Sequence, residues 1–251
     1  MPLRHAIAFD AIAKPGQMPA GLCPVYVPDA PDFLGVYPFS ADRLRLPGGA
    51  SEMRLEVSLA LFAELEYGAH GRVEAVVPRL AGPMLGATVG EAGMKWSVRR
   101  MWGAQSRAIP VQLEILDGFS PGGILDRLQV CAWVGREGVW HAAATPVRAA
   151  QALVLFDRPV LDWLVFAMND QADHGPFERL STRLAQAGEP THALVSWGGA
   201  LMETPPVRAG DAVCVAAWDD ARMNAIEVAQ WLAEGTPETP EALCAMRVEV
   251  A

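Results

Sequence analysis

The sequence has 251 residues, of which 51% are hydrophobic and 20% are charged, and its formal net charge at pH 7 is −9. This composition is ordinary for a globular protein, and the acidic balance argues against nucleic acid, whose binding needs a basic surface. No run of about 18 apolar residues and no basic, apolar leader occurs. We therefore expect a cytoplasmic protein without nucleic-acid or membrane partners.

The N-terminal part of the sequence reads differently from the rest. Residues 14–50 are rich in proline and contain few periodic apolar positions. Such a stretch is typical of a long wrapping segment or a small lobe rather than part of a regular sheet. We expect a loop-rich segment or small lobe over residues 1–50 and a main domain over residues 51–251.

Strand patterns dominate after residue 50. The stretch "MRLEVSLALFAELEYG", residues 53–68, predicts one long strand that ends in a turn, with residues 72–80 as its hairpin partner. Further segments rich in apolar residues and bounded by Gly, Pro or Asp also predict strands. These are residues 111–116, 128–135, 138–147, 193–199 and 212–220.

Helical patterns occur in two places. Residues 158–170 carry Val160, Leu164 and Met168 at helical spacing, and a second short helix is expected within residues 173–190. Near the end, residues 223–235 run from a candidate cap at Asn224 to a glycine stop. We predict an α+β, strand-dominated fold with a short helical insertion near residues 158–187.

The cysteines give no sign of a metal site. They lie far apart and lack both the Cys-x-x-Cys pattern and the Cys/His spacing of zinc sites. We predict that they are buried, reduced thiols. They are Cys23, Cys131, Cys214 and Cys244.

Charged pairs mark both ends of the first long strand. Side chains two residues apart on a strand share a face, so Arg54 and Glu56 point the same way, as do Glu64 and Glu66. Two carboxylates in this arrangement can chelate Mg²⁺ through their oxygens. The alternatives are a solvated strand end for the second pair and a plain surface ion pair for the first.

Basic and aromatic residues gather between residues 95 and 107, directly before a glycine-rich turn at residues 117–123. A guanidinium group can donate two hydrogen bonds to one carboxylate. This cluster can therefore attract a small oxo-acid into a cleft despite the negative net charge of the protein. Glycines in the turn allow close backbone approach to a ligand. The alternatives are a solvated basic face and an ordinary turn. The cluster contains Lys95, Trp96, Arg99, Arg100, Trp102 and Arg107.

A second candidate is the polar stretch that follows the first helix. Asp170 and His174 are four residues apart and can pair on one helical face, which would raise the pKa of the imidazole and suit a general base. The alternative is the polar end of a helix. Serine chemistry is disfavoured, because Ser106, Ser120 and Ser196 lack the Gly-x-Ser-x-Gly pattern.

The order of several segments resembles the fumarylacetoacetate hydrolase superfamily, and more closely a diverged bacterial branch of it. The resemblance implies a mixed β-sandwich roll, often dimeric, that hydrolyses, hydrates, decarboxylates or tautomerises small 2-oxo and 1,3-dioxo acids. It also implies a divalent metal, usually Mg²⁺, which chelates the oxo-acid and stabilises the enolate. The matching segments are residues 33–47, 55–68, 102–107, 117–126, 161–178, 195–199 and 208–219.

Several positions depart from what the resemblance implies. The family begins the long strand with Glu-x-Glu as metal ligands, and this sequence has Arg54 and Glu56. The family's third ligand, an aspartate, falls near residues 84–90, which contain no carboxylate. The N-terminal His/Glu pair and the lysine before the glycine-rich turn are also missing. We therefore expect no metal; Mg²⁺ or Mn²⁺ would bind only if the alignment is slipped, so that Glu64/Glu66 or Glu91 serves.

The resemblance then predicts an enzyme that holds a small anionic oxo-acid by cations in place of a metal, in a protein expected to be a homodimer. Two alternatives stay open: a catalytically inactive homologue that binds a small acid or a protein partner, and an unrelated α+β domain. The expected catalytic residues are Arg107, Asp117 and His174, and the expected substrate-binding residues are Arg54, Glu56, Lys95, Arg99, Arg100, Trp102, Phe119 and Gly122.

Overall fold

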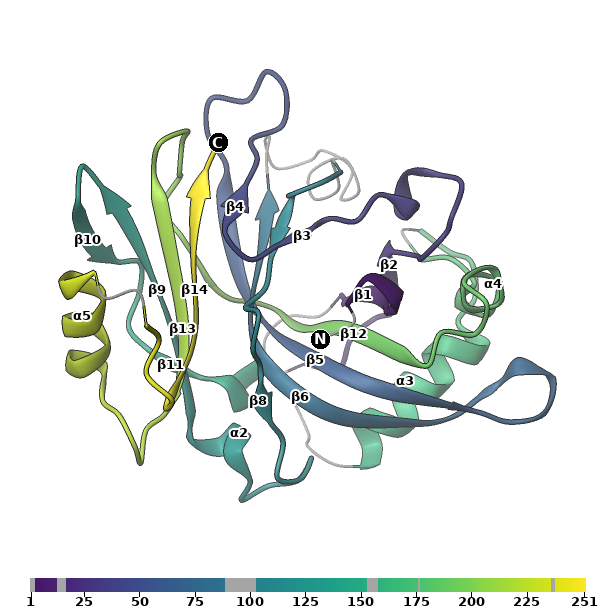
Figure 1. Cartoon of the computed structure of the whole chain (residues 1–251). Helices are drawn as coiled ribbons and strands as arrows, with labels where there is room; N and C mark the ends of the chain where they lie inside the picture. Colours follow the sequence, from purple (N-terminus) through teal and green to yellow (C-terminus); the bar gives the residue numbers. More distant parts are fainter. Residues whose placement is uncertain (1–2, 13–16, 89–102, 153–157, 176, 236–237) are drawn as a thin grey trace.

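The computed structural model describes residues 3–12, 17–88, 103–152, 158–175, 177–235 and 238–251 (Figure 1). In these ranges the strands form an eight-stranded sheet, in the order β2-β1-β12-β5-β6-β7-β3 with β8 on β6, and a six-stranded sheet, in the order β10-β9-β13-β14-β4 with β11 on β9. Both sheets are mixed, because β1 runs parallel to β12 and β4 runs parallel to β14. The predicted strand-dominated α+β class is confirmed.

The elements have the following bounds. The eight-stranded sheet contains β1 (Ile7–Ala11), β2 (Leu22–Tyr26), β3 (Phe39–Ser40), β5 (Arg54–Tyr67), β6 (Val73–Thr88), β7 (Arg107–Ala108), β8 (Glu114–Ile115) and β12 (His192–Glu203). The six-stranded sheet contains β4 (Arg43–Leu44), β9 (Leu128–Arg136), β10 (Val139–Ala142), β11 (Val147–Arg148), β13 (Ala212–Asp219) and β14 (Leu243–Val250). The helices are α2 (Ile124–Arg127), α3 (Arg158–Asp170), α4 (Leu180–Gln186) and α5 (Ala225–Glu234), with short 3₁₀ turns η1 (Leu3–His5), η2 (Phe33–Gly35), η3 (Ala69–Gly71) and η4 (Ala149–Ala152).

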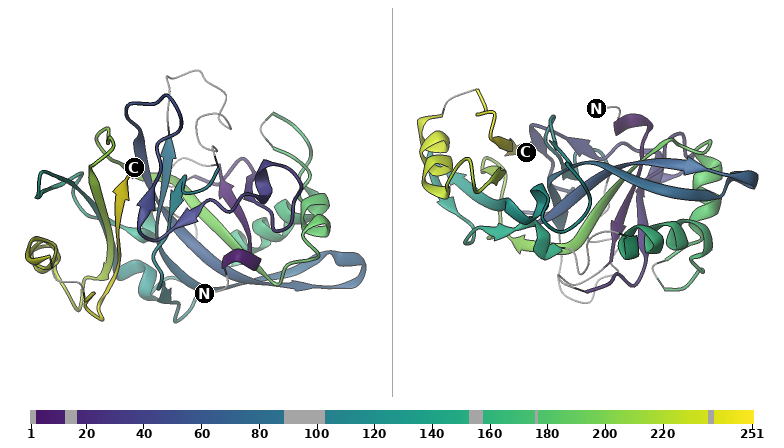
Figure 2. Two further views of the ribbon diagram at one scale, coloured as in Figure 1. Left: turned by 45° about the horizontal axis from the view of Figure 1, so that its top comes forward. Right: turned by 90° about the horizontal axis from the view of Figure 1, so that it is seen from below.

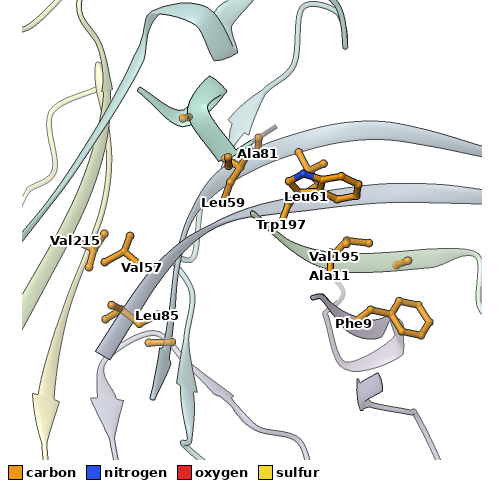
Figure 3. Packing of buried hydrophobic residues seen from close by; sticks show 14 of the residues in the cluster. Phe9, Ala11, Val57, Leu59, Leu61, Ala81, Leu85, Val195, Trp197 and Val215 are labelled. Atoms are coloured by element: carbon orange, nitrogen blue, oxygen red, sulfur yellow. The ribbon is translucent and has the colours of Figure 1, made fainter. Parts of the chain in front are cut away.

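The hairpin of β5 and β6 is the central feature of the eight-stranded sheet. Its register runs from Arg54 opposite Thr88 to Tyr67 opposite Val73. Because side chains alternate between the faces of a strand, Val57, Leu59 and Leu61 enter the main core (Figure 3), to which the six-stranded sheet, α3 and α4 also contribute. The intervening Ala60 and Phe62 join a second apolar cluster on the other face. The strand is therefore buried on both sides, which explains its continuous apolar run.

The helices cover separate parts of the sheets. Figure 1 shows α3 and α4 beside the β5–β6 hairpin, and Figure 2 shows α5 on the side of the six-stranded sheet that faces away from the other sheet. Trp163 of α3 meets the buried Trp197 of β12 edge-on, with ring centroids 5.5 Å apart. Beneath α5, a third cluster includes Trp218, Trp231 and Leu232.

Most predicted elements are found, and the exceptions have physical reasons. The helix predicted over residues 158–170 is present with those bounds, whereas α4 is shorter than expected because His174 and Phe177 form an isolated bridge before it. In the proline-rich segment, where no regular sheet was expected, β2 lies at the edge of the sheet and tolerates Pro24 there. The strands β1 and β14 were not predicted. The expected division near residue 50 stays a prediction.

Replacement of Asn224 by alanine tests the predicted cap of α5. The Asn224 side chain accepts hydrogen bonds from the backbone N–H groups of Ile226 and Glu227, at 2.9 and 3.1 Å, and the Glu227 carboxylate accepts from the backbone N–H of Asn224 at 2.7 Å. We expect Asn224→Ala to lower the free energy of unfolding by about 1 kcal/mol, measured by urea denaturation. Gln230→Ala, on the exposed face of the same helix, is the control; equal losses in both variants would contradict the capping role.

Candidate functional site

Four buried polar side chains gather on one face of the eight-stranded sheet. We call Asp10, Ser58, Ser196 and Arg107, which are between 3% and 8% exposed, the polar cluster. Asp10 lies opposite Ser196 in the β1–β12 register, and Arg107 of β7 lies opposite Gly86 of β6. By strand alternation these side chains share the face of Ala60 and Phe62, away from the main core.

Asp10 and Arg107 show that this face is concave. Arg107 donates two hydrogen bonds to the Asp10 carboxylate, from Nη1 to Oδ1 at 2.8 Å and from Nη2 to Oδ2 at 2.7 Å. Three strands separate β1 from β7, so a flat sheet would hold the two backbones about 19 Å apart, beyond the reach of a direct contact. The sheet must therefore curl until its outer strands face each other across the polar cluster.

Hydroxyl groups complete the cluster. Ser196 Oγ donates to Ser58 Oγ at 3.0 Å, between neighbouring strands β12 and β5. A hydroxyl can donate one hydrogen bond and accept others, so this pair can serve either a carbonyl oxygen or an N–H group. Together with a guanidinium and a carboxylate, the arrangement can orient a small polar molecule and stabilise charge that develops on its oxygens.

Three of the predicted site residues lie on or near this face. Glu56 is half-buried two residues before Ser58 on β5, and Gly86 is the register partner of both Glu56 and Arg107. Arg54 begins β5 on the same face; it is exposed and forms no ion pair with any described carboxylate. Arg107 is buried, and its charge is matched by Asp10. Its expected role as the catalytic anion holder stays a prediction.

The glycine-rich turn has a local structural role. The Asp117 carboxylate accepts a hydrogen bond from the backbone N–H of Ile124 at 2.9 Å, at the start of α2. Gly122 has a φ of 91°, which a residue with a side chain rarely adopts, and Phe119 packs against the main core. These contacts explain why the turn has this sequence. The predicted ligand-binding roles of Asp117, Phe119 and Gly122 stay predictions.

The expected pairing of Asp170 with His174 does not form, because α3 ends at Asp170 and His174 therefore does not share its helical face. Asp170 instead forms an ion pair with Arg72 at 2.8 Å, and His174 Nδ1 lies 3.0 Å from the backbone oxygen of Ala172. The catalytic role expected for His174 stays a prediction.

Most of the predicted basic cluster lies outside the described residues, and Arg107 is its described member. The members outside are Lys95, Trp96, Arg99, Arg100 and Trp102, and Glu91 lies outside as well.

Comparison with known proteins places the chain in a family. A family model described as "Family of unknown function (DUF5718)" matches residues 6–250. The chain belongs to the DUF5718 family. A sequence search of curated proteins gives no match.

Solved structures show which fold the DUF5718 chain has. Maleylpyruvate hydrolase from Sphingobium sp. SYK-6 superposes with a TM-score of 0.53 at 12% identity, over 98% of this chain and 70% of that one. A protein assigned to the fumarylacetoacetate hydrolase family, from Yersinia pestis CO92, gives 0.53 at 10% identity, over 98% and 92%. The chain therefore has the fold of fumarylacetoacetate hydrolase family proteins, as the sequence resemblance implied. None of its described helices combines the length and apolar character needed to cross a membrane.

Among the residues that the structure describes, the candidate metal donors Glu64 and Glu66 of the DUF5718 protein do not form an ion site. The Sphingobium hydrolase has also been solved with manganese(II) and pyruvate. In this chain Glu64 instead binds Arg79, with Oε2 2.7 Å from Nη2, and this hydrogen bond lowers the pKa of the Glu64 carboxyl. Glu66 is exposed. Within the ranges that the structure describes, no three His, Cys, Asp or Glu side chains are grouped to hold an ion.

The thiols of the DUF5718 protein are poor nucleophiles. All four cysteines are buried and none forms a disulfide, as the sequence predicted. Burial raises the pKa of Cys131 to about 11 and the pKa values of Cys214 and Cys244 to about 12. A thiol acts as a nucleophile in its ionised form, so these three groups are almost fully protonated and unreactive near neutral pH.

Sequence reasoning missed Asp10, Ser58 and Ser196 as parts of one site. Each is a lone polar residue within an apolar strand stretch, "IAFDA", "VSLALFA" and "ALVSW". A buried polar group needs a hydrogen-bond partner, so a single polar residue in a fully buried strand is a usable signal. The partners themselves lie 97 and 138 residues away and leave no local trace in the sequence.

Replacement of Asp10 by asparagine should strongly destabilise the protein. The change keeps the size of the side chain but leaves Arg107 buried without its counter-charge, which costs about 3–5 kcal/mol. Asp162→Asn is the matched control, because Asp162 forms an exposed ion pair with Arg158 and should cost less than about 1 kcal/mol. Guanidinium unfolding curves measure both. Similar losses of unfolding free energy in the two variants would show that the buried Asp10–Arg107 pair contributes no more to stability than an exposed ion pair.

Thiol reactivity provides an independent check of burial. With Ellman's reagent at about pH 8, we expect slow reaction of the folded protein and rapid release of four equivalents after denaturation. A thiol that reacts within seconds in the folded protein would contradict the raised pKa values.

Proposed function

We propose that this protein binds a small 2-oxo or 1,3-dioxo acid on the concave face of the eight-stranded sheet. We propose further that it acts on that acid as a C–C hydrolase, hydratase or decarboxylase without the usual divalent metal. The observation that carries the proposal is the polar cluster, a set of buried polar groups inside a fold shared with maleylpyruvate hydrolase. Buried polar groups that converge on one concave surface are typical of ligand sites.

Arg107 is the proposed centre of anion stabilisation. A guanidinium carries five N–H donors, and its pair with Asp10 uses two of them. The pair fixes the plane and direction of the fork, so the remaining donors need no reorganisation when charge develops on an enolate oxygen. Electrostatic stabilisation of the enolate oxygen by these fixed donors would then replace the stabilisation that a bound divalent metal gives.

The serine hydroxyls and Glu56 have proposed roles beside Arg107. Ser58 and Ser196 would orient a carbonyl oxygen or a water molecule by hydrogen bonds. Glu56, half-buried on the same face, would exchange a proton with the substrate carbon or with that water. Arg54, at the mouth of this face, would attract the substrate carboxylate.

The second candidate is a catalytically inactive homologue that binds a small acid. The neutralisation of Arg107 by Asp10 favours it, since a paired guanidinium attracts an anion less strongly than an unpaired one. Binding without turnover would identify this case. A homodimer and a cytoplasmic location remain part of the proposal.

Thermal shift measurements test the proposed site. Oxalate, pyruvate and acylpyruvates should raise the melting temperature by mass action, with the same response in EDTA as in Mg²⁺ or Mn²⁺. Ser58→Ala should weaken oxalate binding about tenfold, because it removes one buried hydroxyl from the polar cluster. The exposed Ser51→Ala is the control.

Two results would overturn the proposal. A response that requires metal would contradict metal-free binding, and a response unchanged in Ser58→Ala would place the acid elsewhere. Pyruvate release from acylpyruvates, followed by coupled reduction, separates an enzyme from an inactive binding protein.

A further inference from the structure

A second group of unusual polar contacts lies on the outer face of the six-stranded sheet, beside α5. Arg247 of β14 lies opposite Cys214 of β13, on the face that α5 covers. Figure 2 shows this face pointing away from the eight-stranded sheet. Arg247 is therefore separate from the polar cluster and takes no part in the function proposed above.

Arg247 is a half-buried cation with incomplete hydrogen bonding. Its guanidinium carbon lies 4.2 Å from the centre of the Trp231 ring, and Nη2 is 3.4 Å from the Trp231 backbone oxygen. Its Nε–H is buried and has no hydrogen-bond partner, and no described carboxylate forms an ion pair with the side chain. The guanidinium also lies next to the Cys214 thiol. A half-buried cation without a described counter-charge can bind a single carboxylate.

Two hollows meet at Arg247. The larger has a volume of 380 Å³, within the usual size range of small-ligand sites, and the smaller has 210 Å³. Trp140 lines the larger hollow and Trp231 lines the smaller. Arg247 thus lines both hollows, and each hollow also has one indole in its wall.

Small residues create the space in front of Trp140. Gly135 lies opposite both Trp140 and Ala212 in the sheet register, and Ala212 lines the larger hollow. A side chain at Gly135 would come within 3.0 Å of the Trp140 ring. The absence of a side chain there lets the indole lie close against the sheet, where its ring can form a wall of the hollow.

The charges on the rim restrict which ligand fits. Asp42 and Glu249 line the larger hollow together with Arg43 and Arg247. Two carboxylates next to two guanidinium groups disfavour a multiply charged anion such as a phosphate ester, while a single carboxylate can still bind the Arg247 fork. Indole rings add favourable stacking for a flat ring.

We propose that Arg247, Trp140 and Trp231 form a binding site for a small aromatic monocarboxylate. The carboxylate accepts hydrogen bonds from the guanidinium, and the ring lies against Trp140. The ordinary structural alternative is that Arg247 only stabilises the C-terminal end of α5 through Trp231. The two cases differ in ligand binding, because a purely structural role predicts no binding of a carboxylate at Arg247. Trp140 packs against the cluster that contains Trp231, so the stability of a Trp140 variant is measured together with its binding.

Benzoate is the probe that tests the site. Binding to the full chain is measured by saturation-transfer NMR and by tryptophan fluorescence, with acetate and benzyl alcohol as controls that lack the ring or the charge. We expect benzoate to bind and both controls to bind at least tenfold more weakly. Trp140→Leu and Arg247→Lys should each weaken benzoate binding at least tenfold, or about 1.4 kcal/mol.

A control variant and a second test variant separate loss of benzoate binding from loss of folding. Arg158→Lys, at an 83% exposed side chain on α3, is the control for an arginine-to-lysine change. If Arg247→Lys is unstable, Trp140→Leu still tests the wall of the hollow. Absence of benzoate binding up to about 10 mM, or equal affinity in Trp140→Leu and wild type, would overturn the proposal. Loss of binding in Ser58→Ala instead would place benzoate on the concave face and also overturn it.

Discussion

One buried ion pair bridges the curl of the eight-stranded sheet, and the candidate site lies on the concave face of that curl. Asp10 and Arg107 lie on strands that three other strands separate, and they meet through two short hydrogen bonds. Removing both charges from water is costly, and the bidentate geometry offsets that cost. Because the two hydrogen bonds require a fixed separation of β1 and β7, the pair is compatible with only a narrow range of sheet curvature.

The start of β5 also affects the electrostatics of the concave face. Solved relatives in fold include one with manganese(II) and pyruvate, whereas the described residues of this chain place an arginine and a glutamate at the start of β5 and a serine two residues later. A hydroxyl and a guanidinium are poor ligands for a divalent ion, but both donate hydrogen bonds to oxygen anions. In the proposed function, the concave face therefore holds an anion by hydrogen-bond donors.

The two sheets present different chemistry. On the concave face the guanidinium is fully buried and matched by a carboxylate, which fixes its position. On the outer face of the six-stranded sheet the guanidinium of Arg247 lies on an indole and retains an unpartnered donor. Fixed, neutralised groups favour stabilisation of charge that appears during a reaction, while an unmatched cation favours a ligand that arrives already charged.

Local sequence determined the elements whose signals are local. The long apolar run of β5, the helical spacing in α3, and the cap and glycine stop of α5 each depend on neighbours within a few residues, and all are present as predicted. In the proline-rich segment the sequence did not predict the strand β2. Pro24 is tolerated there because β2 lies at the edge of the sheet, and its edge position is known only from the assembled sheet.

The site itself was decided by tertiary structure. Asp10 meets Arg107 across 97 positions and Ser58 meets Ser196 across 138, so neither contact leaves a spacing that a reader of the sequence can use. Conversely, Asp170 and His174 have a helical spacing but no contact, because the helix stops between them. Spacing predicts contact only while one regular element continues, and in this protein the polar groups are brought together by the curvature of a sheet.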